Sequence, residues 1–202
     1  MIKNIIFDFG DIFINLDKEA TYKEMVKLGV SDISEDMIDV YHKYEKGLIS
    51  TDEFISFYQN KFPHIKREGL VSAWNAILLD FPKTRLTFLK KLVESKKYKL
   101  ILLSNTNELH ISWIQNNWGM ELYNEFKNCF DKFYLSHEIN FRKPDTEIYE
   151  FVLNENNLVA AETLFVDDLK INTVAAKELR IHVWNLIPGE EDVVELFTKN
   201  QL

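Results

Sequence analysis

Carboxylate, hydroxyl and amide side chains stand directly after three short apolar runs of the sequence. Asp8 follows the first run, and Ser104 and Asn105 follow the second. The adjacent acids Asp167 and Asp168 follow a later run. Carboxylates that are held close together repel one another, and their pKa values rise unless a cation lies between them. Mg²⁺ suits such a place because it prefers oxygen ligands and combines carboxylates with a substrate phosphate. These residue types therefore favour a magnesium site that binds a substrate phosphate group.

The polar residues among these acids suit the phosphate group itself. The hydroxyl of Ser104, the amide of Asn105 and free backbone N–H groups at a helix start can donate to phosphate oxygens. Lys143 adds a compact positive charge. Phosphoryl transfer needs mainly positioning and charge neutralisation, and a carboxylate can itself attack phosphorus and form an aspartyl-phosphate. Each residue alone could equally be a helix cap or a solvated loop residue, so the prediction rests on the ordered set.

A parallel sheet would bring these residues together. Four runs rich in β-branched, leucine and aromatic residues lack clean alternation, which is typical of strands covered on both faces. They cover 4–7, 100–103, 163–166 and 181–184, and 133–135 is a candidate fifth. Helical patterns separate most of them, which predicts an α/β fold, a Rossmann-like doubly wound parallel sheet. Ligands of such sheets bind beyond the carboxyl ends of the strands, where the polar residues stand.

The stretch 15–82 differs from the rest because it has no convincing strand and is typical of several helices. Ser50 and Glu53 fit a capping box at one helix start. A helical apolar face is formed by Met37, Val40, Tyr41 and Tyr44. We therefore predict an α/β core of 1–14 and 83–202, with an all-helical cap of 15–82 inserted after the first strand. The alternative is an all-helical lobe that packs for stability alone.

Composition bounds the class of protein and its partners. The chain has 202 residues, of which 46% are hydrophobic, and a formal net charge of −8, as in a globular protein. The excess of acidic residues argues against a nucleic-acid partner. It does not exclude a small anionic substrate, because a bound metal ion or a lysine can make the site itself positively charged. No apolar stretch approaches the ~18 residues that span a membrane. The single cysteine, Cys129, cannot form an internal disulfide. We expect a cytoplasmic protein without a membrane or nucleic-acid partner.

Four short motifs resemble those of the haloacid-dehalogenase superfamily of phosphohydrolases. They lie at 7–10, at 102–107, at 142–144, and at 165–168 with Asn172. The resemblance covers essentially the whole chain, including the helical stretch after the first motif. It is closest to a branch of small sugar-phosphate phosphatases that are similar to bacterial alpha-D-glucose-1-phosphate phosphatase.

This resemblance implies a nucleophile and its metal. Asp8 would be both the nucleophile and a Mg²⁺ ligand. The carbonyl group of Gly10 and the carboxylate of Asp168 would be further ligands. Lys143 would neutralise the transferring phosphoryl group and orient Asp8.

The same resemblance implies supporting roles for four more residues. Ser104 and Asn105 would hold the phosphoryl group. Asp167 would contact the metal directly or through its ligands, and Asn172 would support the groups around the metal.

One position departs from the pattern of most phosphatases in the superfamily. They carry a second Asp two residues after the nucleophile as general acid and base, and here that position is Gly10. Asp11 stands one residue further on, so we expect its side chain to project elsewhere. Water or His110 would have to assist the leaving group, and for His110 a packing role is equally open. A missing general acid typically costs a factor of about 10²–10⁴, which predicts a slow or selective enzyme.

The sequence thus predicts a Mg²⁺-dependent phosphatase for a small phosphorylated metabolite, with a sugar phosphate as the first choice. Two alternatives stay open. A 2-haloacid dehalogenase also lacks the second Asp but uses no metal, so it would not need the pair Asp167 and Asp168. A non-catalytic protein with this fold could bind phosphate and metal without turnover, and Gly10 is its main support.

Overall fold

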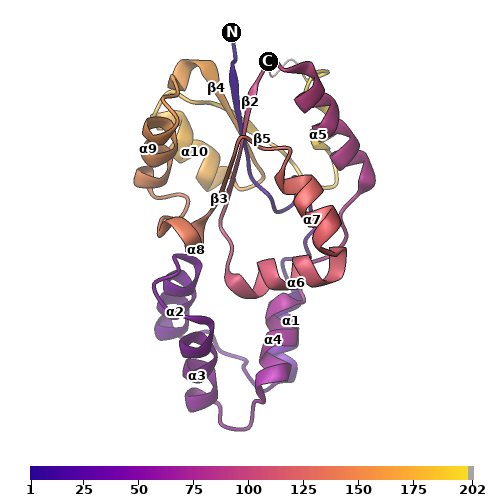
Figure 1. Ribbon diagram of the computed structural model, residues 1–202. Helices are drawn as coiled ribbons and strands as arrows, with labels where there is room; N and C mark the ends of the chain where they lie inside the picture. Colours follow the sequence, from indigo (N-terminus) through magenta and orange to yellow (C-terminus); the bar gives the residue numbers. More distant parts are fainter. Residues whose placement is uncertain (200–202) are drawn as a thin grey trace.

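The apolar runs form a five-stranded sheet in the computed structural model, which describes residues 1–199 (Figure 1). Its strands are β1 (Asn4–Phe7), β2 (Lys99–Ser104), β3 (Lys132–Leu135), β4 (Thr163–Asp167) and β5 (His182–Asn185). The order is β3-β2-β1-β4-β5, and every pair is parallel. The predicted α/β fold with a parallel sheet is confirmed, and all five predicted strands are present with ends that differ by at most one residue.

Helices cover both faces of this sheet. In Figure 1, α9 and α10 lie on one side of the strands and α5 and α7 lie on the other. These and the remaining helices of this part are α5 (Lys83–Ser95), α6 (Glu108–Trp118), α7 (Met120–Lys127), α8 (Ser136–Ile139), α9 (Thr146–Glu155) and α10 (Lys170–Glu178), with short 3-10 turns η1 (Ala160–Glu162) and η2 (Val193–Glu195).

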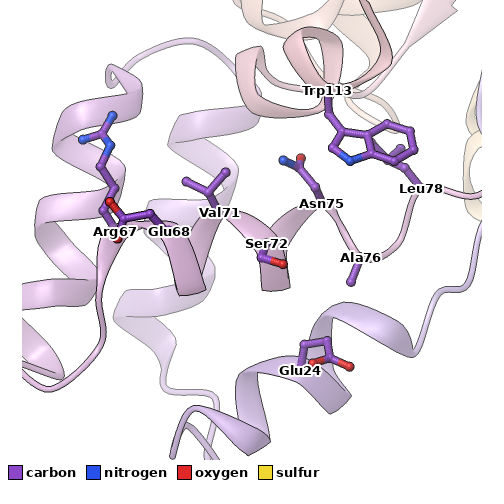
Figure 2. A pocket seen from close by; sticks show the side chains of 9 residues that line it. All are labelled: Glu24, Arg67, Glu68, Val71, Ser72, Asn75, Ala76, Leu78 and Trp113. Carbon is purple, nitrogen blue, oxygen red and sulfur yellow. The ribbon is translucent and has the colours of Figure 1, made fainter. Parts of the chain in front are cut away.

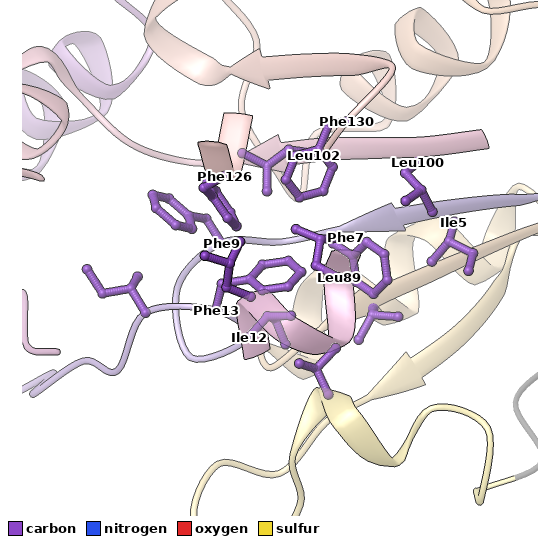
Figure 3. Close-up of a cluster of buried hydrophobic side chains, with 14 of the residues drawn as sticks. Ile5, Phe7, Phe9, Ile12, Phe13, Leu89, Leu100, Leu102, Phe126 and Phe130 are labelled. Atoms are coloured by element: carbon purple, nitrogen blue, oxygen red, sulfur yellow. The ribbon is translucent and has the colours of Figure 1, made fainter. Parts of the chain in front are cut away.

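Side chains of the central strand alternate between two cores. Ile5 and Phe7 belong to the core on the α5 and α7 side, whereas Ile6 belongs to the core beneath α9 and α10. All three are fully buried, which explains why the run lacks a polar alternation. Figure 3 shows Phe7 among the aromatic residues of the first core, with Phe9 and Phe126 stacked at a ring-centroid distance of 5.1 Å.

The strand register brings the predicted site residues to one edge. Phe7, the last residue of β1, pairs with Leu102 on one side and with Val166 on the other. The residues that follow are therefore level with one another, and the backbone N–H of Asp8 donates to the carbonyl oxygen of Val166 at 2.9 Å. Because all strands are parallel, this edge holds every carboxyl end.

Four helices, here called the helical segment, lie between β1 and α5 in the sequence. They are α1 (Ala20–Lys27), α2 (Glu35–Glu45), α3 (Thr51–Lys61) and α4 (Arg67–Asn75). Figure 1 shows them at the end of the molecule toward which the strands point. They share an apolar core of their own, which includes Met37, Phe54 and Trp74. The predicted capping box is confirmed, because the Ser50 hydroxyl and N–H pair with Glu53. The domain boundaries at 15 and 82 stay predictions.

No helix among the described residues combines the length and the apolar character that a membrane crossing requires.

Candidate active site

Lys143 lies at the centre of the predicted site. Its ammonium group donates to Asp8 Oδ1 at 2.7 Å, to Asp167 Oδ2 at 2.7 Å and to the carbonyl oxygen of Leu103 at 2.8 Å. The Lys143 side chain is 1% exposed. Although burial lowers the pKa of this ammonium group, the neighbouring carboxylates outweigh burial and raise it. Lys143 is therefore a fixed positive charge that orients Asp8.

Asp167 is fully hydrogen-bonded within the protein. Its Oδ1 accepts from the N–H of Leu169 at 2.8 Å, and the Asn172 amide donates to both carboxylate oxygens at 3.1 Å. With Lys143 on Oδ2, neither oxygen lacks a partner. Asp167 and Asn172 thus hold Lys143 in place, as supporting residues would.

Asp8 is buried among more negative than positive charge. The pKa of its carboxyl group is raised to about 7: burial is the largest cause, Lys143 acts in the opposite direction, and Asp167 and Asp168 contribute to the rise. A carboxylate that must attack phosphorus has to be ionised. The site therefore needs a further positive charge beside Asp8.

The chemistry of the donor set fits Mg²⁺. Asp8, Asp167 and Asp168 each offer a carboxylate oxygen, and these atoms lie within 4.8 Å of one another. In the described part of the chain no hydrogen bond reaches the carbonyl oxygen of Gly10, which leaves it available as a ligand. Since Asp167 is already saturated, Asp8, Asp168 and Gly10 are the residues that would hold the ion. All of them offer the oxygen ligands that Mg²⁺ requires.

The predicted phosphate-binding residues lie beside this cluster. Ser104 and Asn105 line the same cavity as Asp8 and Lys143. The Asn105 amide pairs with the main chain of Lys143: Oδ1 accepts from its N–H at 2.9 Å, and Nδ2 donates to its carbonyl oxygen at 2.8 Å. Asn105 therefore positions Lys143. Its contact with phosphate stays a prediction.

Lys18 is a site residue that the sequence did not reveal. Its ammonium group pairs with Asp168 and, at 3.0 Å, with Asp11 Oδ2. Asp11 also accepts the N–H of Leu16 at 3.0 Å and does not line the site cavity, in line with the expectation that it projects elsewhere. Lys18 has no motif around it, and only the fold brings it to Asp168.

The helical segment contributes a polar cluster to the wall of the site. Glu45, at the end of α2, accepts from the Tyr41 hydroxyl at 2.5 Å and from Arg142 Nη2 at 3.0 Å. The Glu45 carbonyl oxygen also accepts from the Ser136 hydroxyl at 2.6 Å. The pairing of Arg142 with Glu45 could not be predicted from the sequence, because two segments so distant in the chain leave no local signal.

His110 packs between the two parts of the molecule. Its Nε2 lies 3.2 Å from the carbonyl oxygen of Trp74, and its Nδ1 lies 3.2 Å from the Asn107 amide nitrogen. Burial lowers the pKa of this imidazole to about 4. The ring is neutral at pH 7 with both nitrogens occupied, which favours the packing role over that of an acid.

The site cavity, a space of about 280 Å³, collects these residues. It is lined by Asp8, Gly10, Lys18, Tyr41, Glu45, Ser104, Asn105, His110, Arg142, Lys143, Asp168 and Asn172, among others. A separate hollow of about 630 Å³ lies between α1, α4 and α6, and none of the predicted site residues lines it (Figure 2).

Two named relatives of this chain are phosphatases. It is 32% identical over 186 residues to D-ribitol-5-phosphate phosphatase of Bacteroides thetaiotaomicron, a match that covers 89% of each chain. It is 26% identical to glyceraldehyde 3-phosphate phosphatase of Methanocaldococcus jannaschii, over 100% of this chain and 94% of the relative. These names differ from that of glucose-1-phosphate phosphatase, so the predicted branch stays a prediction.

Solved structures agree with the fold and with a magnesium site. The magnesium complex of a HAD family enzyme from Bacteroides thetaiotaomicron, BT-2542, superposes with a TM-score of 0.86 at 36% identity, covering 97% of this chain and 98% of that one. The same protein was solved with magnesium and inorganic phosphate, with a TM-score of 0.84 and 34% identity over 98% and 100% of the chains. A family model for haloacid dehalogenase-like hydrolases matches residues 5–186. The chain belongs to this family of hydrolases, as its motifs predicted.

Proposed function

We propose that this hydrolase is a Mg²⁺-dependent phosphatase that acts on a small phosphorylated metabolite through an aspartyl-phosphate on Asp8. One observation carries the proposal: Lys143 joins Asp8 to Asp167 at the carboxyl edge of the sheet, with Asp168 close enough to share a cation. Lys143 and Lys18 together cannot balance the four carboxylates of Asp8, Asp11, Asp167 and Asp168. The remaining charge calls for a divalent cation and suits an anionic substrate.

The reaction follows from the free oxygen of Asp8. Lys143 occupies Oδ1, and the other carboxylate oxygen is left to attack phosphorus. The bond from phosphorus to the ester oxygen breaks, the alcohol leaves, and its oxygen takes a proton from water. A second water molecule then attacks the aspartyl-phosphate and gives a proton to the hydroxide left by the first, so that one water is consumed, inorganic phosphate is released and Asp8 is restored. Bound Mg²⁺ would supply charge neutralisation for the phosphoryl oxygens.

A sugar or polyol phosphate is the substrate class that we propose first. The relatives named for ribitol 5-phosphate and glyceraldehyde 3-phosphate support it. The wall of the site cavity also supports this class. Two nitrogens of the Arg142 guanidinium group pair with Glu45, and its remaining N–H donors are available to substrate hydroxyl groups.

We further propose that the helical segment, over residues 15–82, acts as a cap that shields the site from water and selects the leaving group. Tyr41 and Glu45 support this role because both line the site cavity. Cytoplasmic location and the lack of a nucleic-acid partner stay predictions from composition.

The test is phosphate release from a panel of sugar and polyol phosphates plus an aryl phosphate, with Mg²⁺ and with EDTA. Asp8→Asn keeps the size of the side chain but removes the nucleophile, and we expect no turnover. Asp11→Asn is the matched control, because Asp11 is equally buried and contacts Lys18 but does not line the cavity. We expect it to retain most of its activity.

Each failure of this test has a different meaning. Turnover by Asp8→Asn would remove Asp8 from the role of nucleophile. Phosphate release that persists in EDTA would overturn the proposed role of Mg²⁺. Absence of release from every ester, together with halide release from a 2-haloacid in EDTA, would favour the metal-free dehalogenase alternative. Absence of release from every ester, with Mg²⁺ and phosphate still bound, would favour the non-catalytic alternative.

A further inference from the structure

A second cavity, here called the apolar cavity, lies within the helical segment. It encloses about 420 Å³, which falls within the roughly 300–1,000 Å³ of small-molecule sites. Residues of α1, α2, α3, α4 and α6 and of the loops beside α1 and α4 line it: Lys18, Thr21, Tyr22, Met25, Val30, Ile33, Met37, Ile38, Tyr41, His42, Tyr58, Trp74, Ile77 and His110.

The apolar cavity adjoins the site cavity. Four residues, Lys18, Tyr41, Ile77 and His110, line both spaces. Lys18 marks the boundary, because its ammonium group pairs with Asp168 on the side of the site. A substrate whose phosphate lies at Asp8 would therefore point its leaving group toward the apolar cavity.

The lining of the apolar cavity favours hydrocarbon over hydroxyl groups. Met25, Val30, Met37 and Trp74 are buried apolar residues of its wall. Among the described residues that line it, none is acidic. His110 adds no charge, since burial lowers the pKa of its imidazole and both ring nitrogens already have partners.

The rim of the apolar cavity exposes large apolar side chains to solvent. Tyr22 is 49% exposed, Ile33 is 59% exposed and Ile38 is 45% exposed. Several exposed apolar residues around one cavity differ from the scattered ones that any surface carries. A bound apolar group would cover part of this surface.

We propose a second substrate class: phosphate monoesters of alcohols that end in an apolar chain or ring. The phosphate binds in the site cavity and the apolar end fills the apolar cavity. The inference rests on the proposed phosphatase function and extends it beyond sugar phosphates. The chemistry is unchanged: the ester and one water molecule give the free alcohol and inorganic phosphate.

A homologous series of substrates tests this inference. The probes are methyl, butyl, hexyl and octyl phosphate, each assayed for phosphate release with Mg²⁺ beside a polyol 5-phosphate. Each buried methylene group strengthens binding, so we expect kcat/KM to rise about three- to fourfold per methylene until the cavity is full. A series that stays flat while methyl phosphate or the polyol phosphate is hydrolysed would overturn the substrate class and leave the phosphatase intact.

A pair of variants links the effect to the cavity. Ile33→Asp combined with Ile38→Asp places two charges at the rim, and the octyl-to-methyl ratio of kcat/KM should fall at least about fivefold. Val26→Asp is the matched control: Val26 is 41% exposed on α1 and does not line the cavity, so this ratio should not change. An equal fall in both variants would contradict the assignment of the cavity. Absence of release from every ester would overturn the phosphatase function and this inference with it.

Discussion

Lys143 uses all three N–H donors of its ammonium group inside the protein, on Asp8, Asp167 and the carbonyl oxygen of Leu103. A buried lysine is costly unless its charge is paired and its donors are occupied. Here the lysine and the two acids satisfy each other, with Asn172 completing the shell of Asp167. The three charges are interdependent, and removal of any one would leave another buried without its partner.

His110 shows how one buried side chain makes stability depend on pH. Its pKa in the folded protein is lowered to about 4 from the ordinary 6.5, so the unfolded chain binds the proton more tightly. The contribution is complete above about pH 6.5 and is lost as pH falls toward 4. Between pH 7 and pH 5 we expect the free energy of unfolding to fall by about 2 kcal/mol from this residue.

Urea unfolding of the wild type and of His110→Gln at both pH values measures this contribution. Other groups titrate in both proteins, and their effects cancel when the two pH dependences are subtracted. His42→Gln, at a partly exposed histidine of α2, is the control. An identical pH dependence in wild type and His110→Gln would show that the imidazole is not held neutral.

At the scale of elements, the end of α2 is fastened to the core beside β3. The Glu45 side chain pairs with Arg142, and the carbonyl oxygen of Lys46 accepts from the Asn140 amide at 2.7 Å. Gly47 then turns with a φ of 63° directly against the backbone of His137. This junction places Tyr41 and Glu45 in the site cavity, so the composition of the wall depends on a close approach between two backbones.

Gly47→Ala tests that approach. A Cβ at Gly47 would lie 2.0 Å from the carbonyl oxygen of His137, so the junction would have to open. Gly189→Ala is the matched control, since Gly189 also has a positive φ, of 82°, in a turn closed by Glu190 N–H on the carbonyl oxygen of Ile187, but no atom within 4 Å of an added Cβ. The control carries only the backbone cost of about 1 kcal/mol. We expect Gly47→Ala to lose at least about 1 kcal/mol more in urea unfolding. Equal losses in the free energy of unfolding would show that the backbone at this junction moves apart at little cost.

At the scale of the whole molecule, the site joins segments from most of the chain. Asp8 lies near the start, Lys143 and Asp168 lie far along the sequence, and the sheet register holds them together. The unfolded chain therefore has no metal site of this kind. Whatever binds these acids stabilises the entire fold.

Magnesium should accordingly raise the thermal stability of the protein. At a concentration 100 times its dissociation constant, a ligand that binds only the folded state adds about 2.7 kcal/mol. We expect Mg²⁺ to raise the Tm of the wild type, and Asp168→Asn to abolish most of that rise. Asp17→Asn, a substitution outside the cluster, should keep it. An equal rise in wild type and Asp168→Asn would place the metal elsewhere.

The sequence by itself determined the strands, the family and the acids at the carboxyl ends, because apolar runs and short motifs are local. The sequence indicated less well which side chains of each helix are buried. Val93 on α5 and Val174 on α10 fit apolar stripes of their helices, yet they are 41% and 49% exposed. A period of 3.6 residues marks a helix but does not say how far its partner extends.

Only the tertiary structure decided which residues from distant segments meet. The pairing of Lys18 with Asp168 and of Glu45 with Arg142 has no sequence signal, because neither pair is close in the chain. The apolar cavity likewise depends on how α1, α2 and α4 pack around a space that their side chains leave unfilled. The pair Asp8 and Lys143 could be predicted from motifs. The residues that the helical segment adds to the wall of the site cavity required the fold, since packing alone positions them.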